Sequence, residues 1–308
     1  MRVCVCFLLA ASAWSEESKE SQRTVYTYDA NGRRTPAYDQ ASVTGPGGSS
    51  QSQTVRDFDG RRVQLESSEE TVLSEGPEGR VVERLVRKFD SQGRLTGQEK
   101  VRLEENKAGD GSTTVRATVF DRDINGHFAV RERSTTTTQK DSSTTRAETV
   151  VERPNVNGSF DAQERKLSVT TGDENKSLKD VTVYRKDQSG TLTPATREVT
   201  ETTRQGDREV ANTSEYNTAA TGRMELAGQK LSQTVKSPDG SESQVIDVFG
   251  VGQQRQSQLR ERQLIERTPA GGKGMVETFS IQRPALDSSR LGPPQKISET
   301  VCQGNCRP

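Results

Sequence analysis

The stretch DRDINGHFAVRE, which begins at Asp121, has the composition and spacing of a calcium-binding loop. Asp121, Asp123 and Asn125 occupy alternate positions, Gly126 follows them, and Glu132 ends the stretch. An EF-hand loop binds calcium with oxygen-bearing side chains at alternate positions, a glycine at the sharp turn and a final bidentate glutamate. The pattern therefore predicts a calcium site at Asp121, Asp123 and Asn125 if helices flank it.

The flanking segments instead have the composition of strands. Residues 113–120 (TTVRATVF) are rich in β-branched side chains. If residues 127–137 form the next strand, Glu132 lies about 20 Å from Gly126, at ~3.3 Å per residue, and cannot complete the site. Asp, Asn and Gly are also the residues that a hairpin turn favours. We interpret the stretch as a turn and keep a weak calcium site at Asp121, Asp123 and Asn125 as the alternative.

Other catalytic or cofactor chemistry has little support in the sequence. His127 is the only histidine, so a Ser-His-Asp triad would depend on a residue in a turn. The glycine-rich stretches GPGGSS and PAGGKG lack the Lys-Ser/Thr pair of a phosphate-binding loop. Carboxylates alternate with Lys and Arg, which is typical of solvated ion pairs. We expect no enzyme and no cofactor other than calcium, and rank an enzyme with an unrecognised site third.

Four cysteines are present, and two of them are close together at the C-terminus. Cys302 and Cys306 stand in VCQGNCRP. In an oxidising compartment such a pair is expected to form a small disulfide loop. Pairing with another molecule remains the alternative. A metal site would need further ligands, which the neighbouring residues do not supply.

The N-terminus has the layout of a secretory signal. Arg2 precedes an apolar run, and Ala11-Ser12-Ala13 forms a small-x-small cleavage site. We expect residues 1–13 to be the signal peptide and residues 14–23 a linker. No later apolar run is long enough to cross a bilayer as a helix. The sequence therefore predicts a secreted, periplasmic or cell-surface protein with no membrane span.

The overall composition argues against a large apolar core and against nucleic acid as a partner. Only 29% of the 308 residues are hydrophobic, and 44 Lys and Arg are balanced by 44 Asp and Glu. A nucleic-acid-binding domain would show a basic excess on some segment. The chain must adopt a fold that needs little core per residue.

An aromatic residue followed by a turn recurs about every 31 residues along the chain. The recurring segments are YDANGRR, FDGRR, FDSQGRL, FDRDINGHF, VERPNVNGSF, YRKDQSGTL, YNTAATGRM, FGVGQQRQ and FSIQRPALD. A second series of Gly, Asp, Asn and Pro clusters lies half a repeat away, for example TGPGGSS and TGDENK. Two interleaved series of turns are typical of a β-meander. We assign residues 24–301 to the repeat domain and residues 302–308 to a cysteine-containing tail.

The fold predicted from this pattern is all-β. We expect an elongated antiparallel β-meander of about nine hairpins, largely single-layered or gently curled. A transmembrane barrel would fit the chain length, but charged residues stand on both faces of the strands and no aromatic girdle is evident. The prediction is therefore an open sheet with two edges.

The segments YDANGRR (from Tyr28) and FDSQGRLTG (from Phe89) resemble the Tyr-Asp-x-x-Gly-Arg-Leu-Thr core of YD (RHS-type) repeats. The shorter FDGRR at Phe58 keeps part of this core. The resemblance implies a secreted or surface protein in which successive β-hairpins build one continuous curved sheet. The period here is longer than in that family, and later units keep only an aromatic residue and a glycine.

These observations together predict an exported structural or adhesive scaffold that presents polar β faces. A ligand- or calcium-binding repeat module is the alternative. An open sheet has unpaired edge strands, so we expect an unknown protein or cell-surface partner to pair with the N-terminal edge, unless residues 14–23 cover it.

Overall fold

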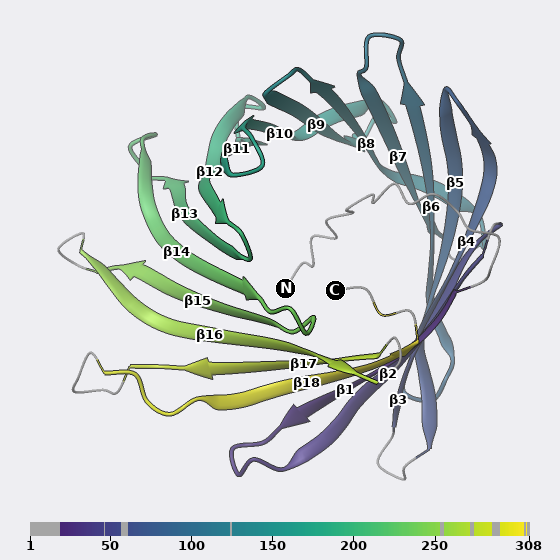
Figure 1. Cartoon of the computed structure of the whole chain (residues 1–308). Helices are drawn as coiled ribbons and strands as arrows, with labels where there is room; N and C mark the ends of the chain where they lie inside the picture. The colour runs from purple at the N-terminus through teal and green to yellow at the C-terminus, as the bar shows by residue number, and fades with distance from the viewer. Residues whose placement is uncertain are drawn as a thin grey trace.

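The strands of the chain pair in one antiparallel sheet that closes on itself. The computed structural model describes residues 19–45, 47–56, 61–123, 125–252, 256–271, 274–284, 290–304 and 306. Each strand pairs with the next in the chain, and β18 (Gln295–Gly304) also pairs with β1 (Lys19–Tyr28). The result is the closed ring of 18 strands in Figure 1.

The odd-numbered and even-numbered strands run in opposite directions along the barrel wall. The remaining odd-numbered strands are β3 (Gly48–Arg56), β5 (Gly79–Phe89), β7 (Thr113–Arg122), β9 (Thr144–Pro154), β11 (Lys176–Lys186), β13 (Arg208–Thr218), β15 (Glu242–Val251) and β17 (Gly274–Gln282). The remaining even-numbered strands are β2 (Arg34–Gly45), β4 (Arg62–Gly76), β6 (Leu95–Lys107), β8 (Phe128–Lys140), β10 (Phe160–Gly172), β12 (Leu192–Gln205), β14 (Met224–Lys236) and β16 (Ser257–Ala270). Among the described residues no helix is long and apolar enough to cross a membrane.

The first series of turn signals forms one end of the barrel, and we call this end the bulge rim. At this rim the backbone N–H of Asp29, Asp90, Asp123, Asn155 or Asp187 donates to the carbonyl four residues later. The side-chain oxygen of the same residue accepts from the backbone N–H groups two and four residues later. The fourth residue of each turn is a glycine with φ between 75° and 87°, a conformation that other residues adopt at a cost. The sequence-based prediction of hairpin turns is confirmed here.

A β-bulge lies just inside the bulge rim in every hairpin that turns there. In β7–β8, for example, Val119 faces Glu132 while Phe120 faces Val130, so Arg131 is the extra residue. The equivalent register shift recurs in β1–β2, β3–β4, β5–β6, β9–β10, β11–β12, β13–β14, β15–β16 and β17–β18. A bulge bends its strand and increases the local twist. A full circle of bulges at one level therefore supplies curvature that an open sheet would lack.

The sheet has two distinct faces that the cross-strand register identifies. Residues directly opposite each other share a face, and the face alternates along each strand. The most buried residues all fall on one face by this rule: Val63, Ser68, Val82, Val101, Val181, Ile281 and Cys302. Side chains crowd together on the concave side of a cylinder. We therefore assign this face to the lumen and call the other face the outer wall.

The predicted antiparallel hairpin meander is confirmed, but the predicted open sheet is wrong. The register between β1 and β18 runs from Ser21–Gly304 to Thr27–Ser298, so neither strand has a free edge. The expectation that a partner pairs with the N-terminal edge, or that residues 14–23 cover it, is therefore wrong as well. β1 already begins at Lys19, within the segment expected to be a linker, and the expected signal peptide lies outside the described residues.

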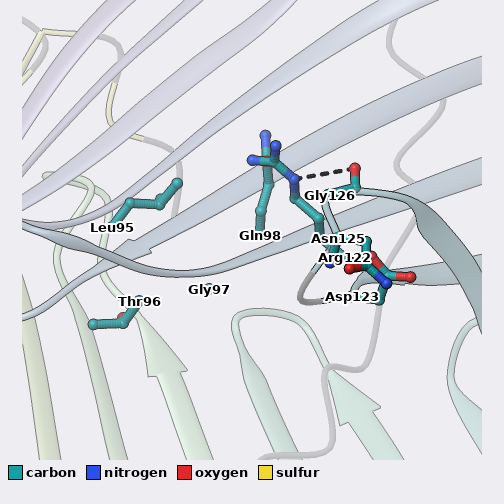
Figure 2. A pocket seen from close by; sticks show the side chains of 8 residues that line it. All are labelled: Leu95, Thr96, Gly97, Gln98, Arg122, Asp123, Asn125 and Gly126. Carbon is teal, nitrogen blue, oxygen red and sulfur yellow. Dashed lines mark hydrogen bonds between the residues drawn. The ribbon is translucent and has the colours of Figure 1, made fainter.

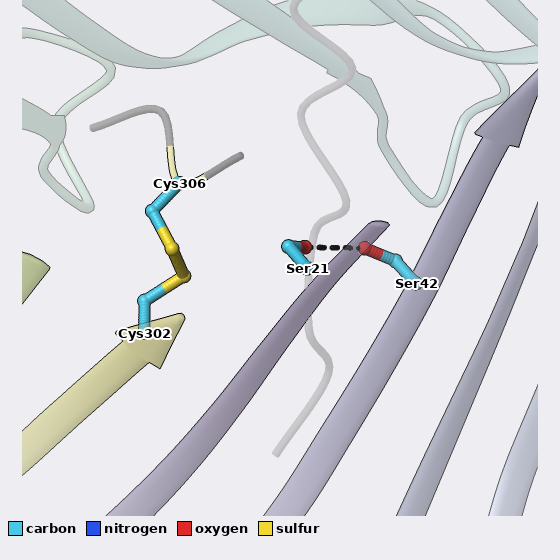
Figure 3. The surroundings of a disulfide bond; sticks show 4 residues. All are labelled: Ser21, Ser42, Cys302 and Cys306. Atoms are coloured by element: carbon cyan, nitrogen blue, oxygen red, sulfur yellow. Dashed lines mark hydrogen bonds between the residues drawn. A yellow bond between two sulfur atoms is a disulfide. The ribbon is translucent and has the colours of Figure 1, made fainter. Parts of the chain in front are cut away.

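The C-terminal cysteines lie at the other end of the barrel, the terminal rim, where β1 begins and β18 ends. The sulfur atoms of Cys302 and Cys306 are bonded, with Cα atoms 6.0 Å apart (Figure 3). Cys302 is the most deeply buried side chain among the described residues, at 2% exposure. Close by on the lumen face, the hydroxyl groups of Ser21 and Ser42 share a hydrogen bond of 2.7 Å.

Two turn aspartates make the stability of the barrel depend on pH. The backbone N–H of Arg94 holds the pKa of Asp90 below its usual value, and the Ser189 hydroxyl does the same for the pKa of Asp187. A carboxyl with a lower pKa in the folded chain stabilises it above pH of about 4, and this contribution disappears as the pH falls further. Asn155 fills the equivalent position in its own turn, so asparagine preserves the turn geometry.

We expect the double variant Asp90→Asn/Asp187→Asn to fold and to lose less stability in acid than the unsubstituted chain. Thermal unfolding followed by circular dichroism between pH 6 and pH 3 measures this difference. Asn155→Asp is the matched control, and it should add acid sensitivity. Equal pH dependence in all three proteins would show that the turn carboxylates are unperturbed.

Candidate functional site

The lumen wall carries hydroxyl groups and charged side chains beside the buried apolar residues assigned to it above, such as Val82, Val101 and Val181. On several neighbouring strands threonine hydroxyl groups are joined across the sheet on this face. Thr136 and Thr149 lie 2.8 Å apart (Oγ1 to Oγ1), and Thr200 and Thr213 lie 2.9 Å apart. The wall therefore presents hydroxyl groups that hydrogen-bond readily to water or to a polar solute.

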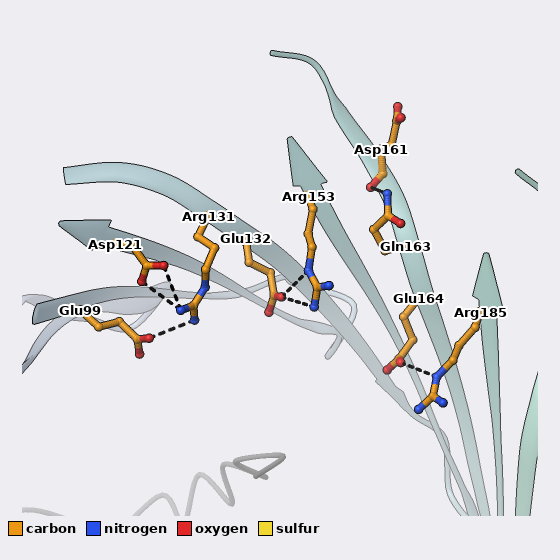
Figure 4. Close-up of polar contacts among 9 residues, drawn as sticks. All are labelled: Glu99, Asp121, Arg131, Glu132, Arg153, Asp161, Gln163, Glu164 and Arg185. Carbon is orange, nitrogen blue, oxygen red and sulfur yellow. Dashed lines mark hydrogen bonds and ion pairs between the residues drawn. The ribbon is translucent and has the colours of Figure 1, made fainter. Parts of the chain in front are cut away.

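A row of ion pairs crosses the lumen face near the bulge rim, as Figure 4 shows. Arg153 Nη2 lies 2.8 Å from Glu132 Oε2 across β8 and β9. Arg185 Nε lies 3.2 Å from Glu164 Oε2 across β10 and β11. Two further lumen-face carboxylates pair in the same way, since Lys230 Nζ lies 2.6 Å from Glu215 Oε1 and Arg283 Nε lies 3.2 Å from Glu261 Oε2. Each of these four pairs therefore contains two charged side chains whose charges cancel.

Arg131, the extra residue of its bulge, connects three strands in this row. Its guanidinium lies 2.9 Å from an oxygen of Asp121 on β7 and 3.0 Å from Glu99 on β6. One arginine thus holds two acids that would otherwise repel each other.

Two of the predicted calcium ligands, Asp123 and Asn125, lie together in the turn that Figure 2 draws, and the third, Asp121, makes different contacts. Asp121 pairs with Arg131, whereas Asp123 Oδ1 accepts the backbone N–H groups of Asn125 at 2.9 Å and His127 at 2.8 Å. Asp123 and Asn125 also line a shallow cleft of about 370 Å³ on the bulge rim, beside Arg122. Within the described part of the chain no group of three or more His, Cys, Asp or Glu residues could hold a metal ion.

Sequence reasoning missed the lumen ion pairs, although they leave a signal. Glu132 and Arg153 are 21 residues apart, as are Glu164 and Arg185. This separation brings a residue after one bulge opposite a residue in the adjoining strand. A search for opposite charges at that spacing would have identified both pairs.

The outer wall also carries ion pairs at mid-height. Arg165 Nε lies 2.7 Å from Glu148 Oε1, Arg262 Nε lies 2.6 Å from Asp247 Oδ1, and Arg197 Nη2 lies 2.5 Å from Asp180 Oδ2. Arg87–Glu69 and Lys100–Glu83 make similar contacts at 3.1 and 3.4 Å. The lumen face and the outer wall both carry charged residues, so the prediction of charges on both faces of the strands is confirmed.

The size of the ring leaves room for a wide interior. Strands about 4.8 Å apart and tilted by about 40° give an 18-stranded barrel a backbone radius of roughly 18 Å. Barrels of 16 to 18 strands are the size at which the interior is too wide for side chains alone to fill.

Comparison with known proteins shows the fold. No protein-family model matches the chain, and no curated protein matches its sequence. Among solved structures, a porin from Rhodopseudomonas blastica is 7% identical, with 93% of this chain and 98% of that chain covered and a TM-score of 0.54. OpdQ from Pseudomonas aeruginosa is 8% identical, with 92% and 96% covered and a TM-score of 0.52. OmpT, an outer membrane protein from Vibrio cholerae, is 8% identical, with 94% and 98% covered and a TM-score of 0.50.

The assignment to YD (RHS-type) repeats is therefore wrong, because the closed barrel resembles porins. The predicted exported structural or adhesive scaffold is wrong for the same reason, since the sheet encloses a lumen and does not present two open faces. The expectation of no membrane span is wrong as well, because it rested on the lack of a long apolar run and on the rejection of a barrel. Outer-membrane barrels cross a bilayer with strands and contain no apolar helix. The chain shares its fold with barrels of the porin type.

Proposed function

We propose that this chain forms a porin-like channel in a cell envelope, through which small polar solutes pass. The observation that carries the proposal is the closed 18-stranded barrel, whose lumen face carries hydroxyl groups and ion pairs. The similarity in fold to porins and to an outer membrane protein supports the same function.

The chemistry of the lumen wall favours small hydrophilic solutes. Threonine hydroxyls such as those of Thr200 and Thr213 offer both donors and acceptors. The Arg and Glu side chains of the ion-pair row cancel each other's charge to first order, as at Glu132–Arg153. We therefore expect weak discrimination between small anions and cations.

The charged residues of the outer wall limit where along its height the barrel can contact the hydrocarbon of a membrane. A lipid-facing Arg or Lys at the bilayer midplane destabilises a barrel by roughly 2–4 kcal/mol, and near the interface by about 0–1 kcal/mol. The charged residues of this wall have partners of opposite sign, such as Asp247 for Arg262. Pairing lowers that cost but does not remove it, because both ions lose water.

Channel activity is tested on the purified chain in liposomes. We expect the loaded vesicles to swell in small sugars, which shows passage of a neutral polar solute. Thr200→Cys places a thiol on the lumen face, and a bulky thiol reagent should then lower the rate several-fold. The neighbouring outer-wall variant Val199→Cys is the matched control and should not respond. No swelling with any preparation, or an equal response of both variants, would contradict the proposal.

Calcium binding by Asp121, Asp123 and Asn125 stays a prediction. Melting temperatures measured with and without calcium test it. Asp121 already pairs with Arg131, and Asp123 already accepts two backbone N–H groups. We expect Asp123→Ala to destabilise the barrel by about 1 kcal/mol through loss of the turn bonds, equally with and without calcium. A melting temperature that rises with millimolar calcium, and does so only when Asp123 and Asp121 are both present, would instead establish the site.

A further inference from the structure

One sector of the lumen wall carries no carboxylate among the described residues. It consists of the lumen-face residues of β18, β1, β2 and β3, and we call it the seam sector because the β18–β1 pairing closes the ring within it. Lys19 and Arg23 are its only charged residues in the described part of the chain, and hydroxyl and amide side chains make up most of the rest. Carboxylates reappear on the adjoining strands, at Glu66 on β4 and at Glu277 on β17.

A cleft of about 150 Å³ lies in the seam sector near the terminal rim. Its lining residues come from three adjoining strands: Ser21 and Arg23 on β1, Gln40 and Ser42 on β2, and Gln51 on β3. All five residues are half-buried. Neighbouring residues therefore restrict their motion while their polar ends stay in contact with the lumen.

The register brings these polar groups side by side although they are far apart in the sequence. Ser42 stands opposite Ser21 on one side and opposite Gln51 on the other, and Gln40 stands opposite Gln53. The Ser21 and Ser42 hydroxyl groups share their hydrogen bond beside the disulfide, as Figure 3 shows. Hydroxyl and amide groups both donate and accept hydrogen bonds. The cleft therefore matches a solute whose own groups do both.

The glutamine amides of the seam sector are not engaged by the protein. Within the described part of the chain, the side chains of Gln40, Gln51 and Gln53 make no hydrogen bond. Elsewhere on the lumen face Gln244 is engaged, since its Nε2 lies 3.0 Å from Ser232 Oγ. A half-buried amide with no protein partner keeps its donors and its acceptor for water or for a solute.

The charge of the seam sector favours an uncharged solute. A cation that entered the cleft would lose water without gaining an opposite charge from this sector. A sugar or another polyol loses only hydrogen bonds between its hydroxyl groups and water, and the amides and hydroxyls of the cleft replace them. Arg23 is the one cation among the lining residues, and its guanidinium is a further donor for an oxygen-rich molecule.

We propose that the cleft lined by Ser21, Gln40, Ser42 and Gln51 binds an uncharged, polyhydroxylated solute such as a monosaccharide or disaccharide. The inference deepens the proposed channel function and rests on it, because the channel brings the solute to the lumen face. It adds that this class of solute is held at the terminal rim and does not merely diffuse past it. Cys302 stands opposite Arg23 across the seam, so ring closure and the disulfide form one border of the site.

Saturation-transfer difference NMR on the purified chain in detergent tests the site, because it detects weak binding and does not require transport. The probes are sucrose, which is uncharged, and gluconate, which is a polyhydroxylated anion. The double variant Gln40→Leu/Gln51→Leu removes both amides from the cleft. Gln22→Leu is the matched control, because Gln22 lies on the same strand as Ser21 but on the outer wall.

We expect sucrose to bind the unsubstituted chain saturably and the double variant to raise its dissociation constant about tenfold, as the loss of one or two hydrogen bonds predicts. Gln22→Leu should leave the dissociation constant unchanged. Binding of gluconate in preference to sucrose would overturn the uncharged class of solute. An unchanged dissociation constant in the double variant, or no binding of either probe, would overturn the site.

The single variant Gln51→Glu keeps the test valid if the double variant does not fold, because it preserves the size of the side chain and replaces only its amide. It should weaken sucrose binding several-fold, and unaltered affinity would count against the site. Liposome swelling in sucrose is measured on the same preparations. Binding without swelling would overturn the channel and leave the site standing, whereas swelling without binding would overturn the site alone.

Discussion

The pairing of β18 with β1 is the constraint on which the rest of the structure depends. An open sheet with these strands would leave two rows of unpaired backbone groups and would have no inside. The register from Ser21–Gly304 to Thr27–Ser298 satisfies both edges. Closure also makes the two faces unequal, because one becomes a concave lumen and the other an outer wall. A lumen exists only because these two strands meet.

The bulges connect local turn chemistry to that closure. Asp90 or Asp187 begins a short turn, a glycine with positive φ completes it, and a single extra residue such as Thr96 or Ala195 follows in the next strand. The extra residue recurs in each hairpin at the bulge rim, so its bending adds up around the ring. It also places aromatic residues such as Phe89 and Tyr184 next to the register shift. One periodic element thus sets both the curvature and the rim.

The barrel is held together with little apolar core. Few of the described side chains are buried, with Val101 and Val181 typical of them, and ion pairs are found on both faces. Exposed pairs contribute little each, so they specify register more than they add stability. The barrel is held together by the backbone hydrogen bonds between long strands, and no strand is left with an unpaired edge. A wall of this kind needs only a modest apolar fraction, which agrees with 29% hydrophobic residues.

The sequence by itself determined the local structure: the repeat, the antiparallel hairpins and the turns at residues such as Asp123, because turn chemistry and β-branched strands act over a few residues. It did not determine whether the sheet closes, since the bulged residues Thr96, Arg131 and Gln163 have no common side chain. Nor did it show which face lines the lumen, because charges occur on both. Asp121 and Arg131 meet only through the bulge, and Cys302 becomes buried only at the closed terminal rim. Each bulge adds a small bend, and the sheet closes only if the bends of all the hairpins add up to a full circle. Closure is therefore a property of the tertiary structure and not of any local segment.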